Sequence, residues 1–205
     1  MKSQTPTPSS SLIPISATTP MPTPRATTAT HLVNNTGFFA PLLRLLRHRL
    51  SELRTPNALA PAALQRLGEQ VTASEQRHTG QIRIVTEGSL PWSYLRRGAS
   101  ARERAIMLFG KHHVWDTAHN NGVLIYLLMP EHAIEIVADR GLAHRVPPEE
   151  WAALVAQMSS HFQQRDYEAG LAHATQAVTT CLVQHFPRAA GATGINELPD
   201  APVVY

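Results

Sequence analysis

The clearest pattern in the chain is an uncharged apolar run that follows a polar turn. The run extends from Val123 to Met129 and is bounded by Gly122 and Pro130. Seven consecutive apolar or aromatic residues predict a strand covered on both faces, as at the centre of an α/β sheet. The His-Asn-Asn-Gly turn at 119–122 is therefore predicted to lie at one end of that sheet.

Two further segments have the pattern of strands. Residues 81–87 (QIRIVTE) alternate and are rich in β-branched side chains, and residues 132–138 follow a tight reversal at Pro130-Glu131. A capping box at Ser100 and Glu103 predicts a helix between the first two strands. A helical crossover favours parallel strands, so strands 81–87 and 122–129 are predicted to be parallel. The third strand is predicted to be antiparallel to the second, because about two residues cannot make a crossover.

Helical periodicity marks the remaining elements. The predicted helix at 58–78 has Pro61 at its first position and a stripe of Leu64, Leu67 and Val71. Two helices close the domain: one begins near Glu149, and the other is capped by Asp166 and ends before Pro187. Buried helical positions are predicted at Ala101, Ala105, Leu108, Phe109, Trp151, Leu154, Val155, Met158, Phe162, Tyr167, Leu171, Ala174, Val178, Cys181 and Leu182. The predicted fold class is α/β: a small three-layer α/β/α sandwich, with a mixed sheet of three to four strands, a β-α-β-β-α-α core and helices on both faces.

Composition divides the chain into four parts. Residues 1–36 are predicted to be disordered, because the first 30 residues contain eight Thr, six Pro and five Ser and little apolar surface. They also resemble an organellar transit peptide; the alternatives are an unstructured extension or an upstream start codon. Residues 37–55 are predicted to form a basic amphipathic helix, residues 56–190 the α/β domain, and residues 191–205 a surface tail.

The basic helix has an apolar stripe of its own. Its leucines at 42, 45, 46, 50 and 53 have helical spacing, with arginines at 44, 47 and 49 opposite. Such a helix either attaches to an anionic membrane surface or a partner, or packs on the domain. The sequence leaves these alternatives open.

Charge and cysteine content limit the class of protein. Residues 1–54 carry six Lys/Arg and one Glu, whereas residues 55–205 carry twelve Lys/Arg and fourteen Asp/Glu. A nucleic-acid surface on the slightly acidic domain is not expected. The single Cys181 excludes an internal disulfide and favours a reducing compartment. No apolar run reaches the roughly 18–20 residues that cross a bilayer, so we predict a soluble cytoplasmic protein.

The predicted topology brings several polar side chains to one edge of the sheet. The two parallel strands begin there and the antiparallel strand ends there, followed by the start of the next helix. Oxygen-bearing side chains of this kind are typical ligands of Ca²⁺ or Mg²⁺. The candidate metal ligands are Asp116, Asn120, Asn121, Asp139 and Glu149. The alternative is that Asn-Asn-Gly is only turn chemistry and Asp139 only a satisfied turn carboxylate.

Other groupings give weaker predictions. His112, Asp116 and His119 would share a face of an uninterrupted helix and could bind zinc, but the nearby Asn-Asn-Gly indicates that the helix has ended. Cys181 and His185 share a helical face, where an inert core thiol is the favoured interpretation. The arginines at 83, 102, 104 and 140 are candidates for holding a phosphate, although only Arg140 is placed at the convergent edge.

Several of these segments together resemble the TPM domain family, specifically its cytoplasmic bacterial members. They are TGQIRIVTE, the arginine-rich helix with LFG, the WDT and HNNGVLIYLL turn and strand, and IEIVADRG. The resemblance covers roughly residues 60–190 and implies a small α/β/α sandwich. Some characterised relatives are described as acid phosphatases and some bind divalent cations, while others assist photosystem repair or modulate a receptor channel. Resemblance to the family therefore predicts the fold more reliably than it predicts an activity.

The resemblance also implies ligand-binding positions. Thr79-Gly80 matches the family's TG before the first strand, Asn121-Gly122 its Asp/Asn-Gly before the central strand, and Gly141 the glycine after the third strand; Arg140 lies beside that glycine. Relatives that are secreted usually carry a signal peptide, a C-terminal membrane helix and an Asp shortly after that glycine, none of which has a clear match here. The expected function is a divalent-cation-binding module that assembles with an unknown protein partner. The alternative is a metal-dependent phosphatase of low specificity acting on phosphomonoesters, with Asp116 and Asp139 as its carboxylates.

Overall fold

The computed structural model describes residues 39–52, 59–189, 191 and 194–205 of the chain. The segment 1–36, expected from its composition to be disordered, lies outside the described residues. The elements are α1 (Phe39–Glu52), α2 (Pro61–Glu75), β1 (Gln81–Glu87), α3 (Trp92–Arg96), α4 (Ala101–Lys111), β2 (Gly122–Leu128), the 3₁₀ turn η2 (Met129–Glu131), β3 (Ala133–Ala138), α5 (Arg140–Ala143), α6 (Pro148–Gln163), α7 (Tyr167–His185) and β4 (Val203–Val204).

The sheet is mixed and has the strand order β3-β2-β1-β4. β1 is parallel to β2, with Gln81 opposite Gly122, and β3 is antiparallel to β2. The predicted strand directions are therefore confirmed. They follow from the capped helix α4 in the β1–β2 connection and the short η2 turn in the β2–β3 connection.

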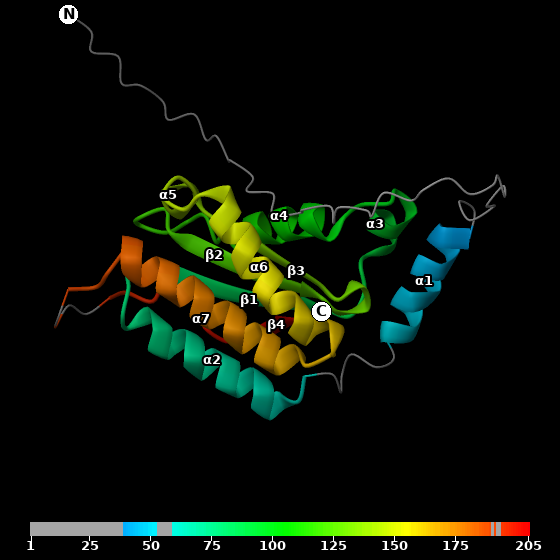
Figure 1. Cartoon of the computed structure of the whole chain (residues 1–205), viewed down its shortest axis with the longest axis horizontal. Helices are drawn as coiled ribbons and strands as arrows, with labels where there is room; N and C mark the ends of the chain where they lie inside the picture. Colours follow the sequence, from blue (N-terminus) through cyan, green and yellow to red (C-terminus); the bar gives the residue numbers. More distant parts are fainter. Residues whose placement is uncertain (1–38, 53–58, 190, 192–193) are drawn as a thin grey trace, which may run out of the picture.

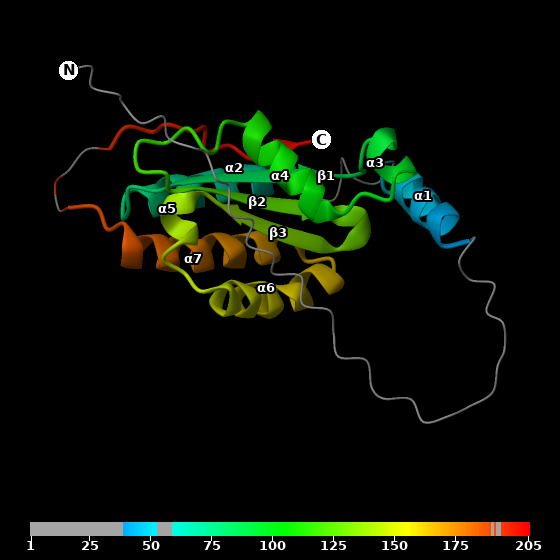
Figure 2. The same ribbon diagram turned by 90° about the horizontal axis from the view of Figure 1, so that it is seen from above.

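Helices cover both faces of the sheet, as predicted for an α/β/α sandwich (Figure 2). On one face, α4 packs on β2 and β3 through Ala105, Leu108 and Phe109. The larger core lies on the other face, where α2, α6 and α7 cover the aliphatic side chains of the strands. β2 is buried along its whole length, which explains why its sequence is apolar on both faces.

Local sequence signals account for most helix boundaries. The Ser100 hydroxyl accepts a hydrogen bond from the Glu103 backbone N–H, and the Glu103 carboxylate accepts one from the Ser100 N–H. Asp166 caps α7 by accepting from the Ala169 N–H. Pro61 begins α2, as the missing N–H of proline at a first helical position predicts.

The C-terminal segment differs from the prediction made from the sequence. Residues 191–205 were expected to form a surface tail, but Val203–Val204 add a fourth strand parallel to β1, and Leu198 is buried. A two-residue strand has too little pattern to be recognised before its neighbour is known. The connection between β1 and α4 contains the short helix α3.

Candidate functional site

The turn before β2 lies beside the end of β3, as the predicted topology requires. The Asp139 N–H donates to the Gly122 carbonyl at 2.8 Å, and the Gly141 N–H donates to the Asn120 carbonyl at 2.8 Å. Figure 1 shows α5 at this end of the sheet, immediately after β3. Residues from two separate segments, 117–122 and 139–141, therefore form one continuous polar end of the sheet, which we call the asparagine end.

Two glycines allow the backbones at this end to approach so closely. A Cβ on Gly122 would lie 1.9 Å from the Val114 carbonyl oxygen, and a Cβ on Gly141 would lie 2.4 Å from the Asn120 carbonyl oxygen. Neither obstacle is a flexible side chain, so any larger residue would have to displace main chain. The Asn120 backbone lies in the left-handed region, with φ of 51°, which asparagine adopts more readily than most residues. The glycines matched to the family thus serve close packing.

The asparagine end contains two buried oxygen atoms that have no hydrogen-bond partner. They are Oδ1 of Asn121 and Oδ2 of Asp139, whose residues are 0% and 3% exposed. The other polar atoms of these side chains are engaged: Asn121 Nδ2 donates to Thr79 Oγ1 at 3.2 Å, and Asp139 Oδ1 accepts from the Arg140 N–H at 2.7 Å. Buried polar atoms are nearly always satisfied, so two unsatisfied acceptors at one end of the sheet are informative.

Burial also affects the charge of Asp139. Removal from water raises the pKa of this carboxyl group, and the hydrogen bond from the Arg140 N–H and the charge of Arg140 only partly oppose that effect. The side chain therefore holds its negative charge at a cost that a nearby positive charge would offset. Such a carboxylate has the chemistry of a cation ligand.

The remaining candidates are placed differently. The Arg140 guanidinium donates to Oδ1 of Asn120 at 3.0 and 3.2 Å, so the Asn120 side chain already has a partner. Asp116 is exposed in the turn that follows α4, and Glu149 is exposed in the first turn of α6. Within the described part of the chain, no three His, Cys, Asp or Glu side chains form a group that could hold a metal ion. The two buried oxygens thus come from one acid and one amide.

The sequence did not indicate how Asp139 fits into the fold. A short helix, α5, begins directly after it, and Asp139 is the N-cap of that helix. The helix was missed because its four residues are too few to show periodicity. The same carboxylate therefore caps α5 through one oxygen and leaves the other oxygen without a partner.

The histidines before β2 do not share a helical face. α4 ends at Lys111, and His113 adopts a positive φ of 54°, which breaks the helical spacing of His112, Asp116 and His119. The expected interpretation as loop histidines agrees with this geometry. Cys181 is buried, and burial raises the pKa of its thiol, as for an inert core thiol.

A buried hydroxyl–imidazole pair lies under the α2–β1 connection. Ser74 Oγ is 2.8 Å from His78 Nε2 and 2.6 Å from Thr179 Oγ1, while His78 Nδ1 is 3.1 Å from the Gly80 carbonyl oxygen. Because a carbonyl only accepts, the His78 proton lies on Nδ1 and Nε2 accepts from Ser74. His78 is 0% exposed and Ser74 is 5% exposed. A substrate cannot reach this pair, so it fixes the fold and is not a nucleophile with its base.

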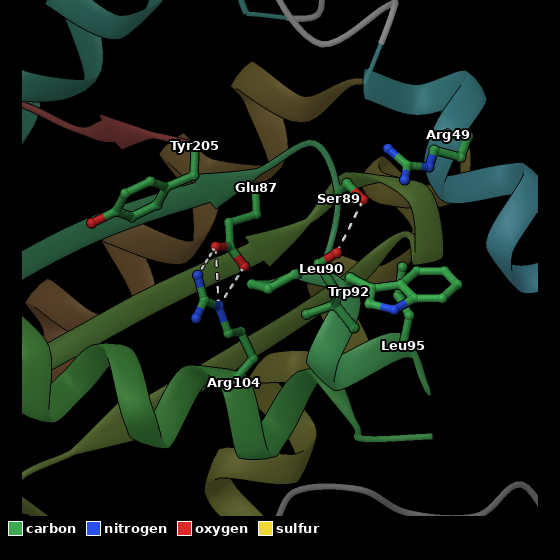
Figure 3. Close-up of a pocket in the computed structure, with 9 residues that line it drawn as sticks. Arg49, Glu87, Ser89, Leu90, Trp92, Leu95, Arg104 and Tyr205 are labelled. Carbon is green, nitrogen blue, oxygen red and sulfur yellow. Dashed lines mark hydrogen bonds and ion pairs between the residues drawn. The ribbon is translucent and has the colours of Figure 1, made fainter. Parts of the chain in front are cut away.

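The opposite end of β1 contains a cavity of about 270 Å³ (Figure 3). A buried ion pair forms one wall: Arg104 Nε donates to both carboxylate oxygens of Glu87, at 3.0 and 2.9 Å. The Tyr126 hydroxyl also donates to Glu87, at 2.7 Å. Arg49 and Trp92 line the same cavity from α1 and α3. The sequence pattern did not reveal this ion pair, because a charge at the end of a buried strand has no periodic signature.

The fold is that of a TPM-like α/β sandwich. The family model for the TPM domain matches residues 54–181, and the chain belongs to the TPM domain family. A search of curated proteins gives no match. Among solved structures, the chain is similar to BA42 from the psychrophilic bacterium Bizionia argentinensis, determined by NMR; identity is 22%, the TM-score is 0.63, and the match covers 72% of this chain and 95% of BA42. At this identity the likeness to BA42 concerns the fold alone.

Across the described ranges, none of the helices combines the length and the apolar character needed to cross a bilayer. The cytoplasmic location and the cytoplasmic subgroup stay predictions.

Proposed function

We propose that this TPM domain is a divalent-cation-binding interaction module, in which the asparagine end binds Ca²⁺ or Mg²⁺. The observation that carries the proposal is the pair of buried, unpartnered oxygens, Asn121 Oδ1 and Asp139 Oδ2. Both are hard oxygen ligands of the kind these ions prefer. A bound cation would satisfy the unpartnered oxygen of Asp139 and stabilise its ionised form.

The chemistry of the donor set predicts weak and pH-dependent binding. Asp139 contributes the only formal negative charge of the pair, and calcium affinity falls with fewer charged ligands. Because burial raises the pKa of Asp139, a proton competes with the cation for this carboxylate. Affinity in the range of extracellular calcium modules, on the order of 10⁻⁴–10⁻³ M, is therefore expected. Exposed Asp116 and Glu149 could join only as outer ligands.

The contacts of the arginines favour an interaction module over the alternative phosphatase. Arg83 donates to the backbone carbonyl of Ala201 at 2.9 Å, Arg102 to that of Ile136 at 2.6 Å, and Arg104 to Glu87. Arg140 is at the asparagine end but is held by Asn120. All four arginines that could hold a phosphate thus have at least one protein partner, although Nε and Nη2 of Arg102 are buried without one.

Cation binding at this end would link the turn before β2 to the α5 segment. The two segments already share main-chain hydrogen bonds through Asn120 and Asp139. A cation held at Asp139 would tighten this link and fix the surface formed by the flanking turns. A partner protein that recognises this ordered surface would then bind in a cation-dependent way.

The test is thermal unfolding of the full chain with and without CaCl₂ or MgCl₂, comparing wild type with Asp139→Asn. The matched control is Asp166→Asn, which makes the same change at the exposed N-cap of α7. At a cation concentration of about ten times Kd, the free energy of unfolding of wild type and of the control should rise by about 1.4 kcal/mol, and that of Asp139→Asn should not change. Equal gains in the Asp139 variant and the control, or no gain in wild type, would refute the proposal. A model phosphomonoester assay on the same proteins should show no turnover that depends on Asp139.

A further inference from the structure

Helix α1 contacts the domain through its polar face. Arg44 donates to Glu131 Oε1 at 2.7 Å and to the Ala99 carbonyl at 2.7 Å. His48 is fully buried: its Nδ1 accepts from the Leu90 N–H at 3.1 Å, so its proton lies on Nε2, which is 3.0 Å from Glu131. His48 is held at both ring nitrogens, and Arg44 donates to two different acceptors. These contacts fix the rotation of the helix about its axis.

That rotation leaves the leucine stripe of α1 in solvent. The exposed fractions are 51% for Leu42, 64% for Leu43, 50% for Leu46 and 61% for Leu50. At about 100° per residue, these four side chains fall within an arc of roughly 100°, and Arg44 and His48 lie on the opposite side of the helix. This arrangement is the reverse of an ordinary amphipathic helix, which buries its apolar stripe on the core.

Positive charge flanks the leucine stripe on both sides. By the same helical geometry, Arg47 and Arg49 lie roughly 80° to either side of its centre, and both side chains are exposed. Residues 39–51 include no Asp or Glu, whereas residues 55–205 carry more acidic than basic side chains. The basic character is therefore concentrated at the edges of the apolar face.

A tryptophan adjoins the same end of the molecule. Trp92 in α3 is 56% exposed, and it lines the 270 Å³ cavity together with Arg49 of α1. Figures 1 and 2 both show α1 beside α3 at one extremity of the fold, away from α5 and the asparagine end. Tryptophan is enriched at the boundary between lipid and water.

We propose that the leucine face of α1 binds an anionic lipid surface, with the helix lying in the plane of the interface. The four leucines would enter the boundary between headgroups and acyl chains. Arg47, beside the leucine face, would reach lipid phosphates while its aliphatic stem stays with the apolar layer. The polar contacts of Arg44 and His48 would hold the domain on the side of the helix that faces away from the lipid. The charge arrangement favours a lipid surface over a second copy of the chain, whose own α1 would present like charges.

The experiment is co-sedimentation of the full chain with phosphatidylglycerol–phosphatidylcholine vesicles and with phosphatidylcholine vesicles alone. The test variant is Leu43→Gln/Leu46→Gln/Leu50→Gln, and the matched control is Ile195→Gln, which replaces an 83% exposed apolar side chain elsewhere. Unchanged unfolding temperatures would show that both variants fold. The triple variant should lose vesicle binding by at least about tenfold, and the control should bind as wild type does. Arg47→Gln and added salt should weaken binding to the anionic vesicles.

Several results would overturn the proposal. They are failure of wild type to bind anionic vesicles, equal binding by the triple variant, and equal binding to the two vesicle types without any effect of salt. Light scattering is run on the same samples. A wild-type dimer that the triple variant converts to a monomer would assign the leucine face to contact between copies instead. None of these outcomes depends on cation binding at the asparagine end, so the two proposals fail independently.

Discussion

Two buried titratable groups at the α2–β1 connection should give stability profiles of opposite sign. Burial lowers the pKa of His78 to about 4, and burial raises the pKa of Glu75 to about 7. Both residues are well buried, at 0% and 7% exposure. Glu75 accepts hydrogen bonds from the Ile82 N–H at 2.8 Å and from Gln81 Nε2 at 3.2 Å, and these bonds only partly offset its burial.

The sign follows from which state binds the proton. Between pH 6.5 and 4, the unfolded chain protonates His78 and the folded protein does not, so His78 lowers stability as pH falls. Between pH 7 and 4.5, the folded protein protonates Glu75 and the unfolded chain does not, so Glu75 raises stability as pH falls. Each slope is about 1.4 kcal/mol per pH unit. The two contributions should nearly cancel between pH 6.5 and 4.5.

Single substitutions should reveal each contribution. Relative to wild type, Glu75→Gln should lose on the order of 3 kcal/mol of unfolding free energy between pH 6.5 and 4.5, because the His78 effect is no longer opposed. His78→Gln should gain a similar amount over the same range. Any hydrogen bond lost in a variant changes the offset of its curve and not the slope.

The assay is urea unfolding of wild type and both variants at several pH values, analysed as differences from wild type. These differences remove the contributions of other titrating groups that the three proteins share. Parallel curves for all three proteins would refute the reasoning, since neither group could then have a displaced pKa in the folded state. Slopes of the same sign in the two variants would also refute it.

Two further predictions concern packing and the buried ion pair. Gly122→Ala should lower the free energy of unfolding by about 3 kcal/mol or more, because its Cβ would meet a main-chain oxygen at 1.9 Å. Gly110 is exposed in α4 with open space around it, so Gly110→Ala should raise the free energy of unfolding by up to about 1 kcal/mol. Chemical denaturation checks both variants, and equal effects would contradict the packing argument. Arg104→Met should lower the free energy of unfolding by about 3–5 kcal/mol, because it leaves the Glu87 carboxylate, which is 1% exposed, without its positively charged partner. Arg97 belongs to an exposed ion pair, so Arg97→Gln should lower the free energy of unfolding by less than about 1 kcal/mol. Similar losses in these two variants would contradict the assigned burial.

Much of the fold followed from patterns that act locally. The uncharged run at β2, the alternation at β1 and the capping box at Ser100 each report a nearby physical requirement, and the loop lengths then determined the strand directions. β4 could not be predicted in this way, because Val203–Val204 becomes a strand only through pairing with β1, more than a hundred residues earlier. α3 and α5 are too short to show a helical period.

The candidate site was predictable in position but less so in detail. Topology placed Asn121 and Asp139 at one end of the sheet, since β2 begins there and β3 ends there. The sequence could not indicate that Asn120 holds Arg140, that Asp139 caps α5, or that Asp116 is exposed, because these depend on side-chain rotamers and burial. The docking of α1 by its polar face was equally unpredictable, because it depends on Glu131, about 80 residues away.

Amide chemical shifts during a Ca²⁺ titration test the central claim most directly. The claim predicts saturable shifts centred on the backbone amides of Asn121, Gly122, Asp139 and Arg140, complete by about 10 mM, with shifts lost in Asp139→Asn. Unchanged amide shifts at these four positions in about 10 mM Ca²⁺, and in the same concentration of Mg²⁺, would contradict it.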